Sequence, residues 1–282
     1  QCNLTQVRQL ALTDDVVEFM VMRLQKLPQA TQEVLKLAAC IGNRFDLATL
    51  AVVCDSSQDN VAADLWRSLQ EGLVIPENET YKFFQGSDCN TENIKNISVS
   101  YQFLHDRVQQ AAYLLIPEKQ QQKTHLKIGQ LLLQNIPIQE REERIFEIVT
   151  QLNHGIELLE TQSQKYQLAE LNLIAGEKAK ASTAYEAALK SATLGLQLLP
   201  TESWQESYDL TLTLHNLAAE TAYLNGDFEQ MILWSELVLD KAANTLDQVK
   251  VYTVKILALT SQQKFSEILE TGLEILNKLG VN

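Results

Sequence analysis

The stretch YQFLHDRVQQAAY, at positions 101–113, joins two kinds of hydrophobic periodicity. Tyr101 and Phe103 alternate with a polar residue, as in a half-buried strand, and the apolar residues that follow have helical spacing. His105 and Asp106 therefore fall at a predicted strand-to-helix junction, where a side chain can point at a ligand. The alternative is purely local, with His105 packing or capping and Asp106 favouring the helix N-terminus through the macrodipole.

The sequence before this junction predicts a small module of helices and strands. Apolar residues at helical spacing predict three helices within residues 30–72, and residues 73–75 begin an extended segment. Paired antiparallel with residues 101–103, that segment completes a winged-helix domain over residues 28–116. The polar stretch 77–100 is its predicted wing.

The sequence after residue 117 is helical throughout and contains an internal repeat. Three segments superpose without gaps from Tyr185, Phe228 and Phe265, at intervals of 43 and 37 residues, and apolar and small residues recur at the same offsets. Stacked helical hairpins produce such a pattern, because each covers the apolar face of its neighbour. We expect residues 117–282 to form an α-solenoid of tetratricopeptide-like hairpins, with a plain helical bundle as the alternative.

Charge argues against a nucleic-acid partner. The net charge is −13, and residues 126–282 carry 12 basic and 21 acidic side chains. The third predicted helix sets Asp59, Asp64 and Glu71 against a lone Arg67, which suits a protein contact better than a phosphate backbone.

Cellular location follows from the apolar runs and the cysteines. No run approaches the roughly 20 apolar residues that span a bilayer, so we expect no membrane contact. The chain begins without an initiator Met, as expected for an internal piece of a longer protein. The four cysteines are scattered without a CxxC pair, which favours reduced thiols and a cytoplasmic protein.

Catalytic motifs are absent from the sequence. Its ten glycines form neither a phosphate-binding G-x-x-x-x-G-K-[ST] loop nor G-x-G-x-x-G, and its four histidines lack metal-ligand spacing. We therefore expect no enzyme activity, no metal and no bound cofactor in this chain itself.

Residues 27–42, Phe45-Asp46 and residues 103–113 together resemble the region after the ATPase core in large cyanobacterial multi-domain kinases. Those proteins join a serine/threonine kinase to a signalling ATPase of the STAND class, an AAA ATPase module, followed by GAF sensor and histidine kinase domains. More distantly, Leu104-His105-Asp106 resembles the Met-His-Asp motif in the winged helix of plant disease-resistance ATPases and apoptosome proteins. This resemblance implies that His105 contacts the β-phosphate of ADP and holds a closed state, while Asp106 supports the turn.

The resemblance also implies an organisation and a function. Residues 1–27 would be the terminal helix of the ATPase lid region, before the winged helix and the arm. The chain would be a non-catalytic regulatory fragment of a two-component signal-transduction kinase, coupling nucleotide state to the arm. Its partners would be the upstream nucleotide-binding domain, neighbouring kinase and sensor domains, and proteins bound to the arm, with ATP or ADP and magnesium in the parent protein. A winged-helix transcription regulator and a plain helical-repeat scaffold are the alternatives.

Overall fold

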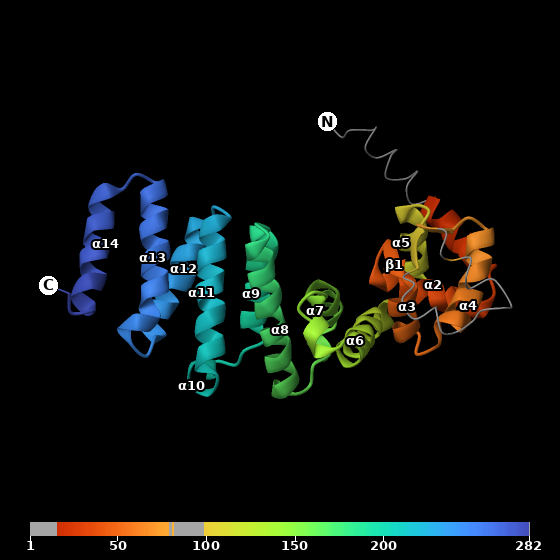
Figure 1. Cartoon of the computed structure of the whole chain (residues 1–282), viewed down its shortest axis with the longest axis horizontal. Helices are drawn as coiled ribbons and strands as arrows, with labels where there is room; N and C mark the ends of the chain where they lie inside the picture. Colours follow the sequence, from red (N-terminus) through yellow and green to blue (C-terminus); the bar gives the residue numbers. More distant parts are fainter. Residues whose placement is uncertain (1–15, 79–80, 82–98, 282) are drawn as a thin grey trace. The chain divides into compact units, whose positions relative to one another are not determined.

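The computed structural model describes residues 16–78, 81 and 99–281, and the chain is mainly helical with one small sheet (Figure 1). Its contacts divide it into two compact units. The first holds the described residues up to Arg141 together with Thr150–Leu158, and the second holds Glu142–Val149 and the described residues from Leu159 onward. The predicted mainly helical class is confirmed.

The first unit contains short helices, three strands and one long helix. Residues 16–24 are helical. The elements that follow are α2 (Gln29–Ile41), β1 (Arg44–Asp46), α3 (Leu47–Val53), α4 (Gln58–Gln70), β2 (Val74–Pro76), β3 (Ser100–Phe103), α5 (Asp106–Leu114), α6 (Glu118–Asn135) and the 3₁₀ helices η3 (Ile138–Glu140) and η4 (Ile156–Leu158). Helix α7 (Ile145–His154) contributes residues to both units.

The sheet has the order β1-β3-β2, and both pairings are antiparallel. The predicted pairing of β2 with β3 is confirmed, with Val74 opposite Phe103. Strand β1 was not predicted, because three residues are too few to show a periodicity. It lies on the other edge of β3, with Phe45 opposite Tyr101.

The aromatic residues of the sheet form the centre of this unit's core. Tyr101 and Phe103 are each 1% exposed, and the ring of Phe45 lies 6.0 Å from the first and 5.5 Å from the second. Burial of aromatic rings is among the largest contributions a single side chain makes to a core. Helix α3, which follows β1, is capped locally: the Asp46 carboxylate accepts from the Thr49 amide at 2.7 Å.

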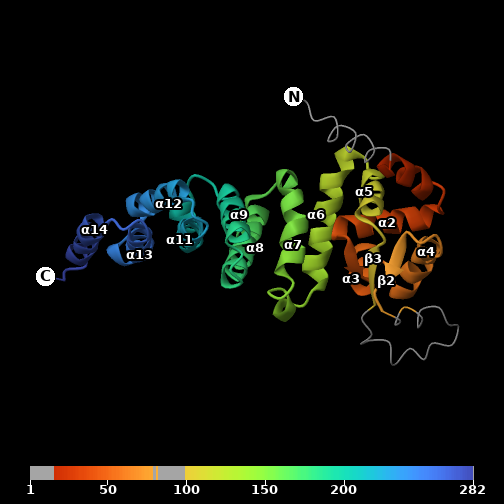
Figure 2. The ribbon, with the colours of Figure 1, turned by 90° about the horizontal axis from the view of Figure 1, so that it is seen from above.

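The second unit is built from helical hairpins. Its elements after α7 are α8 (Gln162–Ala181), α9 (Tyr185–Gln197), α10 (Ser203–Glu206), α11 (Tyr208–Leu224), α12 (Phe228–Lys241), α13 (Thr245–Ser261) and α14 (Phe265–Lys278). The pairs α8–α9, α11–α12 and α13–α14 lie side by side in both views (Figure 1 and Figure 2). The three aromatic residues that align in the sequence each begin the second helix of a hairpin.

The three hairpins turn in the same way. Thr183, Gly226 and Gln263, each two residues before the aligned aromatic residue, all have a left-handed backbone, with φ of 61°, 79° and 59°. Each loop also closes with the same bond, from the amide just before the second helix to a carbonyl five residues earlier, at 2.9, 2.8 and 3.0 Å. This is a Schellman-type helix ending. The repeat seen in the sequence is thus a repeat of local structure.

Some expectations concern residues outside the described ranges. Most of the predicted wing, 77–100, lies there, as does the first half of the segment 1–27. The contacts of α6 group it with the first unit. The division into a lid helix (1–27), a winged-helix domain (28–116) and a helical-repeat arm (117–282) stays a prediction. Within the described ranges, no helix has the length and apolar character to cross a bilayer.

Candidate functional site

His105 lies where the sequence places it, between the end of β3 and the start of α5. Its backbone is extended, with φ −153° and ψ 145°, and it is the N-cap residue of α5. Its Nδ1 accepts a long hydrogen bond, 3.5 Å, from the amide of Arg107. Because Nδ1 accepts this bond, the proton of a neutral ring lies on Nε2, and Nε2 is therefore a donor.

The residues around His105 leave the junction open to solvent. Leu104 is 57% exposed, and His105 and Asp106 are exposed as well. The backbone beneath them is fixed, because Phe103 donates to the carbonyl of Asn43 at 2.9 Å and Leu104 donates to that of Leu73 at 3.0 Å. The junction thus combines the local capping role with an accessible imidazole on a rigid support. The structure is compatible with either reading of His105.

The other end of α5 enters a buried polar network. The hydroxyl of Tyr113 lies 3.1 Å from Nε2 of His125 on α6, and Nδ1 of that ring lies 2.7 Å from Oε1 of Gln151 on α7. Gln151 in turn donates from Nε2 to the carbonyl of Cys40, at 2.8 Å. Four helices are therefore joined through two side chains, His125 and Gln151, that are 5% and 3% exposed.

The donors and acceptors of this network can be assigned from one end. A carbonyl only accepts, so Gln151 presents its amide nitrogen to Cys40 and its oxygen to His125. His125 then carries its proton on Nδ1, and Nε2 accepts from Tyr113. Burial lowers the pKa of His125, and His154 lowers it further, although the bond to Gln151 acts in the opposite direction. Burial also raises the pKa of Tyr113.

The last turn of α2 is where α5 and α7 are both attached. The final carbonyls of a helix have no partner within the helix. Here the carbonyl of Ala39 accepts from the Gln109 side chain of α5 at 3.0 Å, next to the Cys40 carbonyl that accepts from Gln151. Two glutamine amides thus satisfy neighbouring carbonyls, which fixes both helices on α2.

The third helix of the module, α4, carries its one arginine among acidic side chains. Its one arginine, Arg67, is engaged within the protein: it contacts the Glu71 carboxylate at 3.2 Å and donates to Gln70 at 3.1 Å. Arg23 also reaches Glu71, at 3.8 Å.

Metal-binding and thiol chemistry find little support in the described part of the chain. No group of three or more His, Cys, Asp or Glu side chains there could hold a metal ion. Cys40 is buried and Cys54 half-buried, both as free thiols. Burial raises the pKa of Cys40 to about 12 and, with the charge of Asp64, that of Cys54 to about 11, so neither is a reactive thiolate.

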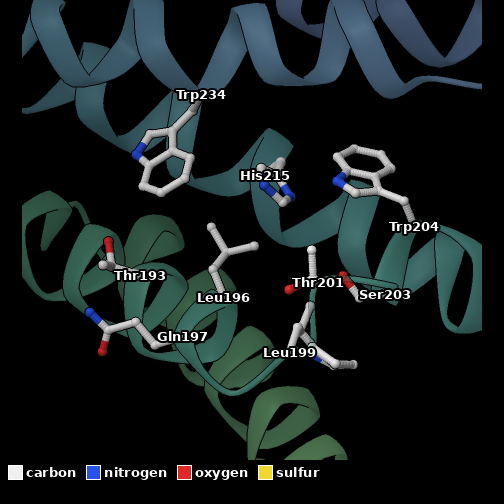
Figure 3. A pocket seen from close by; sticks show the side chains of 10 residues that line it. Thr193, Leu196, Gln197, Leu199, Thr201, Ser203, Trp204, His215 and Trp234 are labelled. Atoms are coloured by element: carbon white, nitrogen blue, oxygen red, sulfur yellow. The ribbon is translucent and has the colours of Figure 1, made fainter.

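A second candidate site, which the sequence analysis missed, is a cavity of about 300 Å³ in the second unit. Figure 3 shows the side chains of Trp204 and Trp234 on either side of His215. The ring of His215 lies 4.9 Å from that of Trp204 and 5.6 Å from that of Trp234. The sequence does contain a trace of this site: the first repeat interval is six residues longer than the second.

The chain is 29% identical over 325 aligned positions to hybrid signal transduction histidine kinase G of Dictyostelium discoideum. The alignment covers 99% of this chain and 9% of that protein, so the chain spans less than a tenth of its relative. No family model and no solved structure matches the chain. The chain is therefore similar along its whole length to part of a signal-transduction kinase.

Proposed function

We propose that this chain is a non-catalytic regulatory segment of a large signal-transduction kinase. The observation that carries the proposal is the alignment of nearly the whole chain with a small part of a hybrid histidine kinase. We further propose that the parent contains a STAND-class ATPase, as in the cyanobacterial kinases that the sequence resembles, and that this chain couples its nucleotide state to a helical arm.

The arrangement of the first unit supports its assignment as a winged helix. Its described elements follow the order helix, strand, helix, helix, strand, strand from α2 to β3, and the two last strands pair antiparallel. In this proposal the acidic α4 serves a protein contact and not DNA. The hairpins of the second unit, with their common loop, support a tetratricopeptide-like arm.

His105 is the proposed sensor of the ADP phosphate, and Asp106 supports the turn that carries it. An exposed imidazole with its donor on Nε2 suits a phosphate oxygen, and the N-terminus of α5 adds its positive dipole end. ATP or ADP with magnesium would be bound by the parent protein and not by this chain alone.

The polar network supplies a route by which a change at His105 could reach other helices. Helix α5 carries His105 at its beginning and Tyr113 in its last turn, and Tyr113 contacts His125 of α6. A displacement of α5 on nucleotide exchange would disturb that hydrogen bond. Differential contact with ADP and ATP is what a two-state switch requires.

The first described helix supports contact with an upstream nucleotide-binding domain. Val17 and Leu24 pack in the core, but Val16, Phe19 and Met22 on the same helix are 43%, 52% and 50% exposed. A helix that is apolar on two faces is typical of a segment covered from both sides.

The test uses the full-length parent kinase with His105→Ala and, as a matched control, Leu104→Ala at the neighbouring exposed position. We expect His105→Ala to weaken ADP binding and raise basal kinase output, because a hydrogen bond to a charged phosphate contributes roughly 1.5–3 kcal/mol to the closed state. Unchanged ADP affinity and unchanged output in His105→Ala would contradict the sensor role.

Two further measurements separate the alternatives. Calorimetry on this chain alone should detect no tight ATP binding, because the phosphate loop is missing. If this chain retains a DNA probe specifically at physiological salt, that result would favour the alternative of a winged-helix transcription regulator. A parent kinase indifferent to every substitution at His105 would favour the plain scaffold.

A further inference from the structure

The cavity of the second unit lies at the one place where the hairpin repeat is interrupted. The connection from α9 to α11 runs from Leu198 to Ser207, ten residues, whereas α12 and α13 are joined by three, Ala242–Asn244. The longer connection adds residues to the first repeat interval, and α12, which is one residue longer than α9, adds one to the second. Together these two differences account for the six residues by which the first interval exceeds the second. Insertions in helical repeats commonly build a binding face.

The inserted segment carries much of the cavity wall. Leu199, Pro200, Thr201, Ser203 and Trp204 line it from the insertion. The rest of the lining comes from the hairpins on either side, namely Thr193, Leu196 and Gln197 of α9, His215 of α11 and Trp234 of α12. At the positions equivalent to Trp234, the other two hairpins have Ser191 and Thr271. The tryptophan at this position is thus particular to the α11–α12 hairpin.

The insertion is held on both sides, so the cavity is formed before anything binds. The side chain of Gln162 on α8 donates to the Leu198 carbonyl at 3.2 Å, and Tyr166 donates to the Glu206 carboxylate at 3.1 Å. From α11, the Thr211 hydroxyl donates to the Ser203 carbonyl at 3.1 Å. Preformed, mostly apolar cavities with a few polar groups are typical ligand sites.

The polar atoms of the cavity are neutral. Nδ1 of His215 lies 2.7 Å from the Thr211 carbonyl, which assigns its proton there and leaves Nε2 as an acceptor. Burial lowers the pKa of His215, which keeps the ring uncharged. In the part of the chain that the structure describes, Trp234 Nε1 is buried and has no acceptor.

The surroundings of the cavity are acidic. Residues 191–240 contain eight Asp and Glu and no Lys or Arg, but Glu220 pairs with Lys180 and Lys250, and Asp240 pairs with Lys241. Two of these carboxylates, Glu202 and Glu206, lie on or beside α10 and are exposed. An apolar, aromatic cavity flanked by these two exposed carboxylates favours a ligand with an apolar anchor and a positive charge.

We propose that this cavity, between Trp204 and Trp234, binds an aromatic side chain of a partner protein, presented by a segment that also carries Lys or Arg. This inference rests on the proposed protein-binding role of the arm and specifies the partner's chemistry. Aromatic anchors in desolvated pockets dominate the energetics of many interfaces, while flanking charges set the rate and selectivity of association.

The experiment is selection of random peptides displayed on phage against the full 282-residue chain, with counter-selection against Trp204→Ala. We expect the recovered peptides to contain an aromatic residue within a few positions of Lys or Arg. A synthetic peptide of the recovered sequence is then titrated into a Trp66→Phe chain, in which the tryptophan fluorescence comes from Trp204 and Trp234 alone. Saturable change in that fluorescence is the expected result.

Matched variants locate the binding. Trp204→Ala should weaken the peptide at least tenfold and Trp204→Phe should restore most of the affinity, while Leu233→Ala, at an exposed position of α12 that does not line the cavity, should change nothing. Replacing the aromatic residue of the peptide by Ala should abolish binding, and replacing its basic residues should weaken it and remove its salt dependence.

Several results would overturn the inference. If the peptides bind Trp204→Ala and the unaltered chain with equal affinity, the arm would still bind proteins, but this cavity would not be the binding site. Recovery of peptides without aromatic or basic residues, or of none that discriminates the variant, would refute the partner chemistry. Saturable quenching by adenosine instead of peptide would indicate a nucleoside site. None of these outcomes bears on the His105 test in the parent kinase.

Discussion

The rings of His125 and His154 lie face to face in the first unit, with centroids 4.4 Å apart and planes 21° apart. Burial lowers the pKa of His125 below its ordinary 6.5, and the neighbouring His154 lowers it further, although the hydrogen bond to Gln151 raises it. The folded protein therefore keeps His125 neutral, with its two nitrogens engaged by Gln151 and Tyr113.

The first prediction concerns the pH dependence of stability. Between the folded pKa of His125 and the unfolded value of about 6.5, the unfolded chain binds more protons, so the free energy of unfolding falls as the pH falls through that window. His215, whose pKa is also lowered, contributes with the same sign. Each histidine can contribute a slope of at most about 1.4 kcal/mol per pH unit.

Urea unfolding measured between about pH 8 and pH 5 checks this prediction. The variant His125→Gln should have a shallower slope than the unaltered chain, and His125→Gln with His215→Gln should be shallower still. The slopes are compared, not the absolute stabilities, because glutamine changes the packing. If the slope of the free energy of unfolding against pH stays the same in the double variant, groups other than these two histidines cause the loss of stability at low pH.

The second prediction contrasts two neighbours at the β3–α5 junction. His105→Ala should cost this chain less than about 1 kcal/mol, since it removes an exposed side chain and a long capping bond. Phe103→Ala should cost about 3–5 kcal/mol, because it empties a site that is 1% exposed. Chemical denaturation of both variants measures the difference. Equal losses would mean that His105 is structural.

The third prediction concerns the three left-handed loop residues. Gly226→Ala should destabilise by about 1 kcal/mol through backbone strain, because no atom lies within 4 Å of the added Cβ. Thr183→Gly and Gln263→Gly should be neutral or stabilise by up to about 1 kcal/mol, since relief of strain exceeds the entropy that glycine adds. Thermal unfolding followed by circular dichroism measures both the expected loss and the expected gain of stability. Destabilisation by Gln263→Gly would contradict the inference that the backbone of Gln263 is strained.

The fourth prediction uses two leucines at equivalent repeat positions. Leu189 of α9 is 9% exposed, while Leu269 of α14 is 67% exposed. Leu189→Ala should therefore cost about 2–4 kcal/mol, and Leu269→Ala should change the stability of this chain by no more than about 0.5 kcal/mol. The comparison needs only denaturant midpoints. A large loss at Leu269 would mean that α14 is covered in solution.

Much of the local structure could be read from the sequence. The alternation at Tyr101 and Phe103 identified a strand, and the repeat aligned Tyr185, Phe228 and Phe265, each of which begins a helix in the structure. The positions of His105 and Asp106 at a strand-to-helix junction followed from the same periodicities. Their role toward a nucleotide stays a prediction.

The sequence by itself determined the elements, because hydrophobic spacing and turn chemistry act over a few residues. Only the tertiary structure decided which distant side chains meet: Gln151 reaches the Cys40 carbonyl, and β1 finds its place on β3. In the same way, Trp204, His215 and Trp234 come from three different helices and line one cavity. No local pattern encodes such meetings, because they follow from how whole helices pack and where an insertion interrupts that packing.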